Sequence, residues 1–308
     1  MQGLVQNLGP GKNKRKLPKN QASRLTQARY GRDLRVSLER FHDVIRSTLI
    51  PEISGIIAQA DAGDARWAAR VAGLMAAIRA AGSSTPELAA PRAQRVAEEI
   101  SSKVANKIGR QVKAGTGMDV GPVFARGPLR KADAETPNVL DDTAQITAFI
   151  IKNVALIKDI ADVEAKQIES VVLESITAGR RASDIEALIL ERIAIGNRRA
   201  KNIARDQVAK LHGQLTRARQ VSLGVGEYIW RTALDERVRE SHLRLEGTVH
   251  SWDSPPVING RPLHPGDDYN CRCHAEPIFF PEEAQSGPTS GDRTRIKEVR
   301  ARRARIGR

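Results

Sequence analysis

The sequence predicts a mainly α-helical protein with a small carboxy-terminal α+β module, made of a short helix and a few short strands, and with disordered basic termini. Apolar residues recur at three- and four-residue intervals over most of the chain, which is the spacing of one helix face. Aromatic residues make up only 4% of the composition, as in helices that pack through small and branched side chains. After Gly226 this period stops, and turn-forming residues and prolines indicate a different fold for the module.

The amino-terminal part of the chain divides into an arm and three helices. Residues 1–20 form a basic arm with few apolar residues, so we expect the arm to be disordered. Residues 21–113 follow as a helical region, whose first helix breaks at Pro51 and whose second runs from about residue 64 to Gly82. An apolar stripe predicts a third helix over about residues 86–113.

The middle of the chain combines a linker with a second helical region. Residues 114–140 are rich in glycine and proline and carry no apolar period. A loop of this length is uncommon within a compact domain, so it predicts a linker and a domain boundary. Residues 141–225 are helical again, with two helices expected before Gly179 and a short third helix that ends at Gly196. The last helix, from Asn197, is predicted to be the longest.

The module, residues 226–281, concentrates the chemistry of the chain. It opens with the β-like stretch EYIWRTAL and continues with a short helical stretch, DERVRESHLRLEG. Asp235 and His242 are seven residues apart, so on one helix they share a face. Cys271 and Cys273 are two residues apart, so in an extended segment their side chains point the same way. These four side chains predict a tetrahedral metal site, and thiolates with imidazole suit structural zinc.

Other interpretations of the same residues stay open. The two cysteines could be buried thiols without a metal, with Asp235 and Arg272 forming an ion pair. A disulfide between cysteines two residues apart is strained and is not expected. His250 is an alternative ligand to Asp235, whereas His264 and His274 are expected to be exposed.

A catalytic site is the remaining interpretation of this cluster, as part of a metal-dependent nuclease or another DNA-processing enzyme. Its metal would need carboxylates such as Asp253, Asp267 and Asp268, or a zinc ion with one open position. No spacing among these residues demands that role, and the chain has no Gly-x-Ser-x-Gly motif or phosphate-binding glycine loop. We therefore expect no enzymatic activity, no catalytic residues and no cofactor apart from structural zinc.

The charge of the chain indicates a polyanionic partner. Lys and Arg outnumber Asp and Glu by 50 to 36, which gives a net charge of +14, and residues 282–308 form a basic tail that is either disordered or a lone helix. Such an excess predicts nucleic acid as the partner, the alternative being solvated basic faces. We expect non-specific contacts to phosphates of double-stranded DNA from Lys12, Lys14, Arg15, Lys16, Arg300, Arg302, Arg303 and Arg305.

The sequence carries no sign of a membrane span or of secretion. No apolar run reaches the roughly 18–20 residues that cross a bilayer, and the amino terminus has no apolar stretch of signal-peptide length. Two cysteines in 308 residues are too few for a disulfide scaffold, so a reducing compartment is expected.

The order of residues in the module points to a known family. The string WRTALDERVRESHLRLEG, a later Pro-Gly pair and CRCHAEP together resemble the phage Mu F-like family of minor head, or head morphogenesis, proteins. The preceding helical sequence looks like that family's lead-in helix, which extends the resemblance to about residues 140–280. One position departs from the family pattern, because Asp206 and Gln207 stand where the family commonly has Thr-Glu. The resemblance is carried by Trp230, Thr232, Asp235, Arg237, Arg239, His242, Gly247, Pro265, Gly266, Cys271, Arg272, Cys273 and Pro277.

The resemblance implies a structural protein of a tailed phage or prophage rather than an enzyme. It implies attachment to the portal protein and other head proteins during assembly, and involvement in DNA packaging, retention or delivery. The implied location is the virion head near the portal, and the host cytoplasm during assembly. On this hypothesis the helical regions form the scaffold that docks on the portal, the module is a rigid knob, and the basic ends touch DNA.

Overall fold

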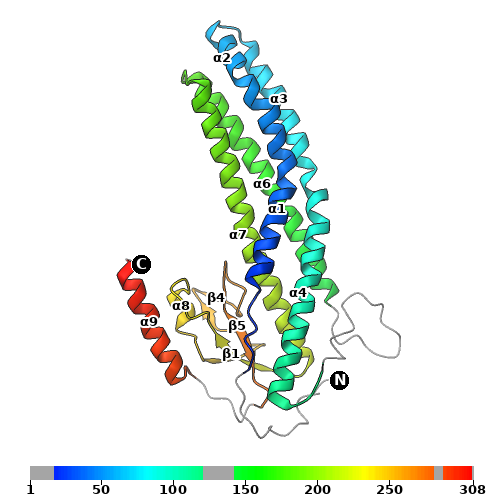
Figure 1. Cartoon of the computed structure of the whole chain (residues 1–308), viewed down its shortest axis with the longest axis vertical. Coiled ribbons are helices and arrows are strands. Elements are labelled where there is room, and N and C mark those ends of the chain that lie inside the picture. The colour runs from blue at the N-terminus through cyan, green and yellow to red at the C-terminus, as the bar shows by residue number, and fades with distance from the viewer. Residues whose placement is uncertain (1–16, 121–141, 281–286, 307–308) are drawn as a thin grey trace, which may run out of the picture. The chain divides into compact units, whose positions relative to one another are not determined.

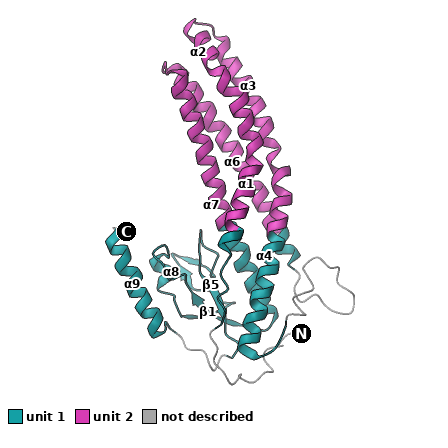
Figure 2. Cartoon of the chain, viewed as in Figure 1, with its two compact units in different colours: residues 1–26, 97–147, 206–308 teal, residues 27–96, 148–205 magenta. Residues whose placement is uncertain are grey.

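The computed structural model describes residues 17–120, 142–280 and 287–306 of the 308-residue chain (Figure 1). Packing contacts divide the chain into two compact units, each built from separate stretches of sequence (Figure 2). The sequence predicts domains that are each one continuous segment, whereas the segments of these two units alternate along the sequence. Unit 1 comprises residues 1–26, 97–147 and 206–308, and unit 2 comprises residues 27–96 and 148–205.

The chain is mainly helical, as predicted. Helix α4 ends at Thr116, so only the first residues of the predicted linker are helical, and most of that linker lies outside the described residues. The helical elements are α1 (Arg24–Val44), the π-helical turn η1 (Ile45–Leu49), the 3₁₀ turn η2 (Ile50–Glu52), α2 (Ile53–Asp61), α3 (Arg66–Ser83), α4 (Thr85–Thr116), α6 (Thr143–Thr177), α7 (Ala182–Ser222), α8 (Glu240–Leu243) and α9 (Ser290–Ile306).

Unit 2 consists of helices that run side by side (Figure 2). Their apolar faces meet in a core of mostly branched aliphatic side chains, as the low aromatic content predicts. The core also contains some aromatic side chains, such as Tyr30 and Phe149, whose rings lie 5.9 Å apart. Side chains that are almost completely buried in this core include Leu34, Leu38, Phe41, Ile45, Leu49, Ile53, Ile56, Met75, Ile78, Ile157, Ile168, Val172, Ile185 and Ile189.

Proline and glycine punctuate these helices less uniformly than the sequence predicts. Pro51 interrupts the α-helical hydrogen bonding as expected, because proline lacks an N–H, and the chain passes it through η1 and η2. Gly179 follows α6 in a left-handed conformation, with φ of +68°. The helix end predicted at Gly196 is wrong, because α7 continues through this residue. The two helices predicted before Gly179 are likewise one continuous helix, α6. A Cβ at Gly196 would overlap the carboxylate of Glu164, so this glycine permits a close helix approach.

The module contains a three-stranded antiparallel sheet with β1 (Glu227–Arg231) in the centre, between β2 (Val249–Ser251) and β5 (His274–Pro277). A separate small hairpin pairs β3 (Val257–Ile258) with β4 (Arg261–Pro262). Side chains alternate along β1, so that Tyr228 and Trp230 are buried and their neighbours are half-buried. The core of the module gathers Tyr228, Trp230, Trp252, Ile258, Cys271, Cys273 and Ala275.

The helix of the module is shorter than predicted. It comprises only α8, and Arg239 before it has the extended backbone ψ of 148°. Asp235 therefore lies in the turn that precedes the helix, and the expectation that Asp235 and His242 share one helix face is wrong. The helical spacing failed here because the stretch holds only one helical turn, too short to define a face.

The termini also differ from the prediction. Of the basic arm, only residues 17–20 are described, and they are held in place, because buried Asn20 donates a hydrogen bond of 3.1 Å to Thr216. Disorder of the tail is contradicted over α9, which is a packed helix. Ile296 and Val299 of α9 are buried against Val238 and Leu243.

Within the described ranges, no helix combines the length and the apolar character that a bilayer crossing requires.

Candidate metal centre

Three side chains of the module that can bind a metal converge within unit 1. His242 lies on α8, and Cys271 and Cys273 lie on the segment that leads into β5. Each sulfur is 3.5 Å from Nδ1 of His242, and the three ligand atoms all lie within 4.8 Å of one another. Both cysteines are free thiols, so the disulfide that the sequence disfavours is absent. All three side chains are buried or nearly so, and two sulfurs with one imidazole nitrogen suit Zn²⁺.

The imidazole is oriented from its other side by a carboxylate. Nε2 of His242 lies 3.1 Å from Oδ2 of Asp268, which leaves Nδ1 facing the sulfurs. Asp268 is itself buried and accepts hydrogen bonds from Arg239 and Arg261, each of 3.0 Å, and from the backbone N–H of Tyr269. A carboxylate behind a histidine is the usual arrangement at zinc sites, because it fixes the ring and raises its basicity.

The cysteines are positioned by a tight loop that packs on α7. Gly266 turns the loop with φ of +101°, and a Cβ at Gly213 of α7 would lie 2.9 Å from the carbonyl oxygen of Pro265. Close to the cysteines, Asn270 has a left-handed φ of 52°, and its N–H donates a 2.7 Å hydrogen bond to the buried carboxylate of Asp206. The loop is thereby fixed to the helix on both sides of Asp268.

Residues 166–276 match the family model described as Phage Mu protein F like protein. This segment is a Phage Mu F-like domain. Over 82 residues the chain is 45% identical to an uncharacterized protein of Haemophilus influenzae, a stretch that makes up 27% of this chain and 18% of the relative. The chain thus spans less than a fifth of that relative's length. No solved structure matches the chain.

The Mu F-like domain contains the three converging side chains and all but one residue of the recognised motif, Pro277. It also contains Asp206, the position that departs from the family pattern. Asp206 is buried, forms a 2.7 Å ion pair with Lys210, and holds the turn before Cys271 through Asn270. This acidic position therefore has a structural contact in this chain.

The charge states of the Mu F-like cluster are linked. Burial acts to lower the pKa of His242, but the thiol of Cys271 and the carboxylate of Asp268 outweigh it and raise the pKa. The hydrogen bond from Cys273 is the main cause that lowers the pKa of Cys271, and burial raises the pKa of Cys273. Cys271 therefore loses its proton before Cys273, and a thiolate beside a histidine favours binding of a cation.

The structure does not bring the fourth predicted ligand, Asp235, into this cluster. Both oxygens of Asp235 accept hydrogen bonds from the guanidinium of Arg272. Partial burial acts to raise the pKa of Asp235, but the hydrogen bonds and charge of Arg272 outweigh it and lower the pKa. This is the ion pair that the alternative interpretation of the sequence describes, and it lies next to the converging thiols.

The other histidines of the module are engaged elsewhere. His250, the alternative ligand, lies 2.7 Å from the hydroxyl of Thr248. The expectation that His264 and His274 are exposed is wrong, because both are buried. Nδ1 of His264 lies 3.0 Å from the hydroxyl of Tyr228, and His274 lies in the paired strand β5, where burial lowers its pKa to about 3. Their sequence surroundings are turn-rich and polar, which gave no sign that the segment folds back onto the sheet.

The carboxylates considered for a catalytic metal are dispersed. Asp253 is exposed, and Asp267 accepts a 2.9 Å hydrogen bond from the backbone N–H of His264. Asp268 alone reaches the cluster, behind the imidazole of His242. The sequence offered Asp268 only as a catalytic candidate, and no spacing signal pairs it with a histidine 26 residues away.

The predicted DNA contacts lie in the amino-terminal arm and in helix α9. Lys12, Lys14, Arg15 and Lys16 lie outside the described residues. In α9, Arg302 and Arg305 are exposed. Arg300 and Arg303 both bind the carboxylate of Glu240, at 2.6 and 3.0 Å.

Proposed function

We propose that this chain is a minor head protein of a tailed phage or prophage that acts structurally in head morphogenesis. The observation that carries the proposal is the Phage Mu F-like domain over residues 166–276. In this role the long helices of unit 2 dock on the portal protein, and the chain resides in the virion head, after assembly with other head proteins in the host cytoplasm. Regular helices with a rigid apolar core suit a scaffold, because they present fixed side-chain rows to a partner.

The same role includes non-specific contact with double-stranded DNA. The net charge of +14 supports it, as do the exposed cations of α9, among them Arg302 and Arg305. Lysine and arginine bind phosphates without reading the base sequence, and such binding weakens steeply as salt displaces it. The arm residues Lys12, Lys14, Arg15 and Lys16 are proposed to add to these contacts.

We further propose that the module holds a structural Zn²⁺ through His242, Cys271 and Cys273. The cluster is buried, which suits a metal that stabilises the fold better than one that must reach a scissile phosphate. Among the described residues, His, Cys, Asp and Glu side chains supply three ligands here, so a tetrahedral ion would take its fourth ligand from outside this set.

Docking on the portal is tested by co-expressing the chain with the portal protein of the same phage or prophage. We expect the two proteins to purify together through an affinity tag on either one. Incubation of the purified chain with plasmid and Mg²⁺, Mn²⁺ or Zn²⁺ tests the rival function. No association with the portal, together with plasmid cleavage that His242→Ala abolishes, would replace the structural proposal with a nuclease.

Metal binding is tested by elemental analysis of the purified chain and by the absorption spectrum of its Co²⁺ form. We expect one metal ion for each chain, held by two thiolates. Asp268→Asn should weaken metal binding by about 10–100-fold, because it loosens the carboxylate that orients His242. Asp253→Asn, at an exposed position of the same module, should leave the affinity unchanged. A wild-type chain that neither contains nor takes up metal would refute the proposal.

A further inference from the structure

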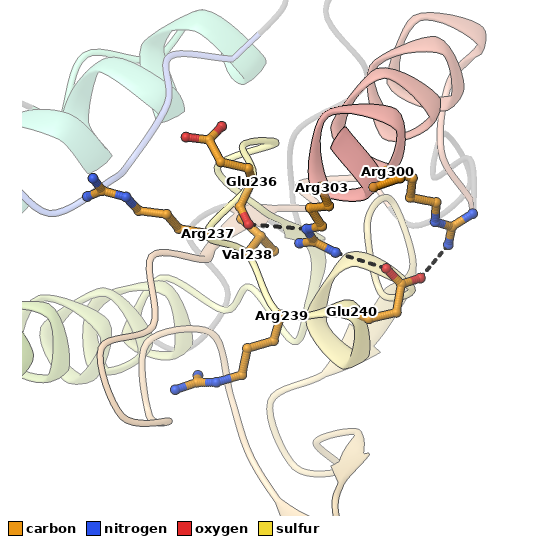
Figure 3. A pocket seen from close by; sticks show the side chains of 8 residues that line it. Glu236, Arg237, Val238, Arg239, Glu240, Arg300 and Arg303 are labelled. Carbon is orange, nitrogen blue, oxygen red and sulfur yellow. Dashed lines mark hydrogen bonds and ion pairs between the residues drawn. The ribbon is translucent and has the colours of Figure 1, made fainter. Parts of the chain in front are cut away.

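Helix α9 is attached to the module by a small apolar contact and by a shared carboxylate. Ile296 and Val299 are the buried apolar residues of α9. One turn further on, Arg300 and Arg303 both bind Glu240, the first residue of α8, and Arg303 also donates to the carbonyl oxygen of Glu236 at 3.1 Å. Figure 3 shows the Glu240 carboxylate between the two guanidinium groups.

The amino-terminal end of α9 has separate anchors. The hydroxyl of Thr289 and the carboxylate of Asp292 cap the helix reciprocally, with a hydrogen bond of 2.7 Å between their side chains. Asp292 also lies 3.3 Å from Arg231 of the central strand, and the N–H of Gly287 donates to the carbonyl of Gly247 at 2.7 Å. The start of α9 is thus held by contacts that do not involve Glu240, whose two arginine partners lie in the carboxy-terminal half of the helix.

The cations of α9 are thereby divided into two sets. Those in the first set, Arg300 and Arg303, are committed to Glu240. Those in the second set are exposed and form no ion pair with any described residue: Arg293, Arg295, Lys297, Arg302 and Arg305. One carboxylate thus compensates two guanidinium groups of α9, and it also lies 3.9 Å from the guanidinium of Arg244, directly after α8. The rest of α9 keeps its charge.

We propose that Glu240 is a charge clasp that withholds Arg300 and Arg303 from DNA and so limits how strongly α9 binds a polyanion. The proposal rests on the DNA contact proposed above and adds its regulation. A phosphate chain and the Glu240 carboxylate compete for the same guanidinium groups, because the carboxylate neutralises part of their positive charge and repels an approaching phosphate.

The clasp is open to such competition. The side chain of Arg300 is 52% exposed and that of Glu240 is 39% exposed, so solvent and ions reach the pair. It borders a pocket of about 610 Å³ lined by residues 236–240 and by Arg300, Arg303 and Ala304. Arg303 is more enclosed, with 14% of its side chain exposed, so its release requires the end of α9 to move away from the module.

A matched pair of substitutions tests the clasp. Glu240→Gln removes the carboxylate that binds both arginines. Glu236→Gln removes one negative charge from the same pocket, and the Glu236 carboxylate has no ion-pair partner among the described residues and points away from Arg303 in Figure 3. Binding of each full-length variant to a labelled DNA duplex of mixed sequence is measured over a series of KCl concentrations.

Glu240→Gln should bind the duplex more tightly than Glu236→Gln does. Its slope of log K against log salt should steepen by about 1.8, since each additional phosphate contact contributes about 0.9. Adding Arg300→Gln and Arg303→Gln should abolish this gain in the Glu240→Gln chain and change little in the wild type. Circular dichroism of each variant confirms that its helices persist.

Equal salt slopes for the Glu240 and Glu236 variants would overturn the clasp while leaving DNA binding in place. Absence of duplex binding by the wild type and all variants would instead overturn the proposed DNA contact, and the clasp with it. All variants could instead bind the duplex with equal affinity but differ in their affinity for an acidic protein. That result would overturn the competition with DNA and reassign the clasp to a protein partner.

Discussion

Unit 2 and the module, residues 226–281, are stabilised in different ways. Unit 2 has long helices and an apolar core, in which the buried pair of His42 and Glu164, 3.1 Å apart, is a polar exception. The described part of the module has strands of two to five residues, and one core cluster in it holds seven buried residues, two of which are cysteines. Its loops are held by ion pairs and side-chain hydrogen bonds centred on Asp268, Asp235 and Arg231.

The difference follows from how much apolar surface each region can bury. The parts of α6 and α7 that belong to unit 2, residues 148–177 and 182–205, carry an apolar face that the core buries. Strands this short bury few side chains, so turns and polar contacts must define the module. Hydrogen bonds and ion pairs are directional, so they can hold three metal-binding atoms within a few ångströms of one another. The apolar packing of a helical core does not need such directional contacts.

The largest effect should come from deleting a ring in the core of unit 2. Phe41 is fully buried and would contact a Cβ added at Gly82, at 3.4 Å. Phe41→Ala should lower the free energy of unfolding by about 3–5 kcal/mol, because it leaves a cavity in a tightly packed interior. Urea unfolding followed by circular dichroism measures this loss. Val36→Ala, at an exposed site on the same helix, should cost less than about 0.5 kcal/mol, and equal losses at the two sites would contradict the view of an apolar core.

Removing one sulfur should have the next largest effect, and it should fall on the module. Cys271→Ser should lower stability by about 1–3 kcal/mol, because it puts a hydroxyl into the core of the module and removes a ligand of the proposed metal. Thermal unfolding with and without a chelator measures it, and Ser254→Ala at an exposed site is the control. An unchanged melting temperature in Cys271→Ser, with a metal-free wild type, would rule out a metal as a source of the module's stability.

Acid should weaken unit 1 through a histidine that is buried without charge. Burial lowers the pKa of His212 on α7 to about 3, so the unfolded chain binds a proton near pH 6.5 that the folded chain does not. Stability from this group is present above about pH 6.5 and is lost as pH falls toward 3. Between pH 7 and about 5.5 the loss is about 1 kcal/mol. Melting curves at both pH values should show a smaller loss in His212→Gln, whereas parallel pH profiles would rule this contribution out.

The smallest effect should come from the half-buried ion pair beside the cluster. Asp235→Asn should cost about 0.5–1 kcal/mol at neutral pH, since solvent screens a pair that is roughly a quarter exposed. The lowered pKa of Asp235 means that the pair stabilises the fold above the usual carboxyl pKa, near 3.9, and that this contribution disappears as pH falls below it. Melting temperatures of wild type and variant should therefore converge at low pH. A constant gap between them would show that the pair contributes no pH-dependent stability.

Sequence patterns predicted the helices well because helix signals are local. The end of α6 at Gly179 and the disturbance at Pro51 follow from the backbone preferences of single residues. Gly196 was misinterpreted because a glycine that ends a helix and a glycine that makes room for Glu164 look the same in sequence. The distinction depends on a residue 32 positions away, on another helix.

The candidate metal centre was predicted in part, because some of its signals are also local. Cys271 and Cys273 are close in sequence, so their convergence was foreseeable. His242 was included through its seven-residue spacing from Asp235, although the two residues do not share a helix face in the structure. The sequence could not show which carboxylate binds the imidazole of His242, because Asp235 and Asp268 have the same side chain. Arg272 engages the first, and the loop held by Asp206 delivers the second.

By itself, the sequence determined the helical character of the chain, the place where the helices give way to the module, and the ordered motif of a Phage Mu F-like domain. These depend on periodicity and on neighbours within a few residues. Only the tertiary structure decided which carboxylate stands behind His242 and that the basic tail is a helix docked through Glu240. The physical reason is that charges of one sign are interchangeable along a chain, and only the folded backbone determines which opposite charge each one meets.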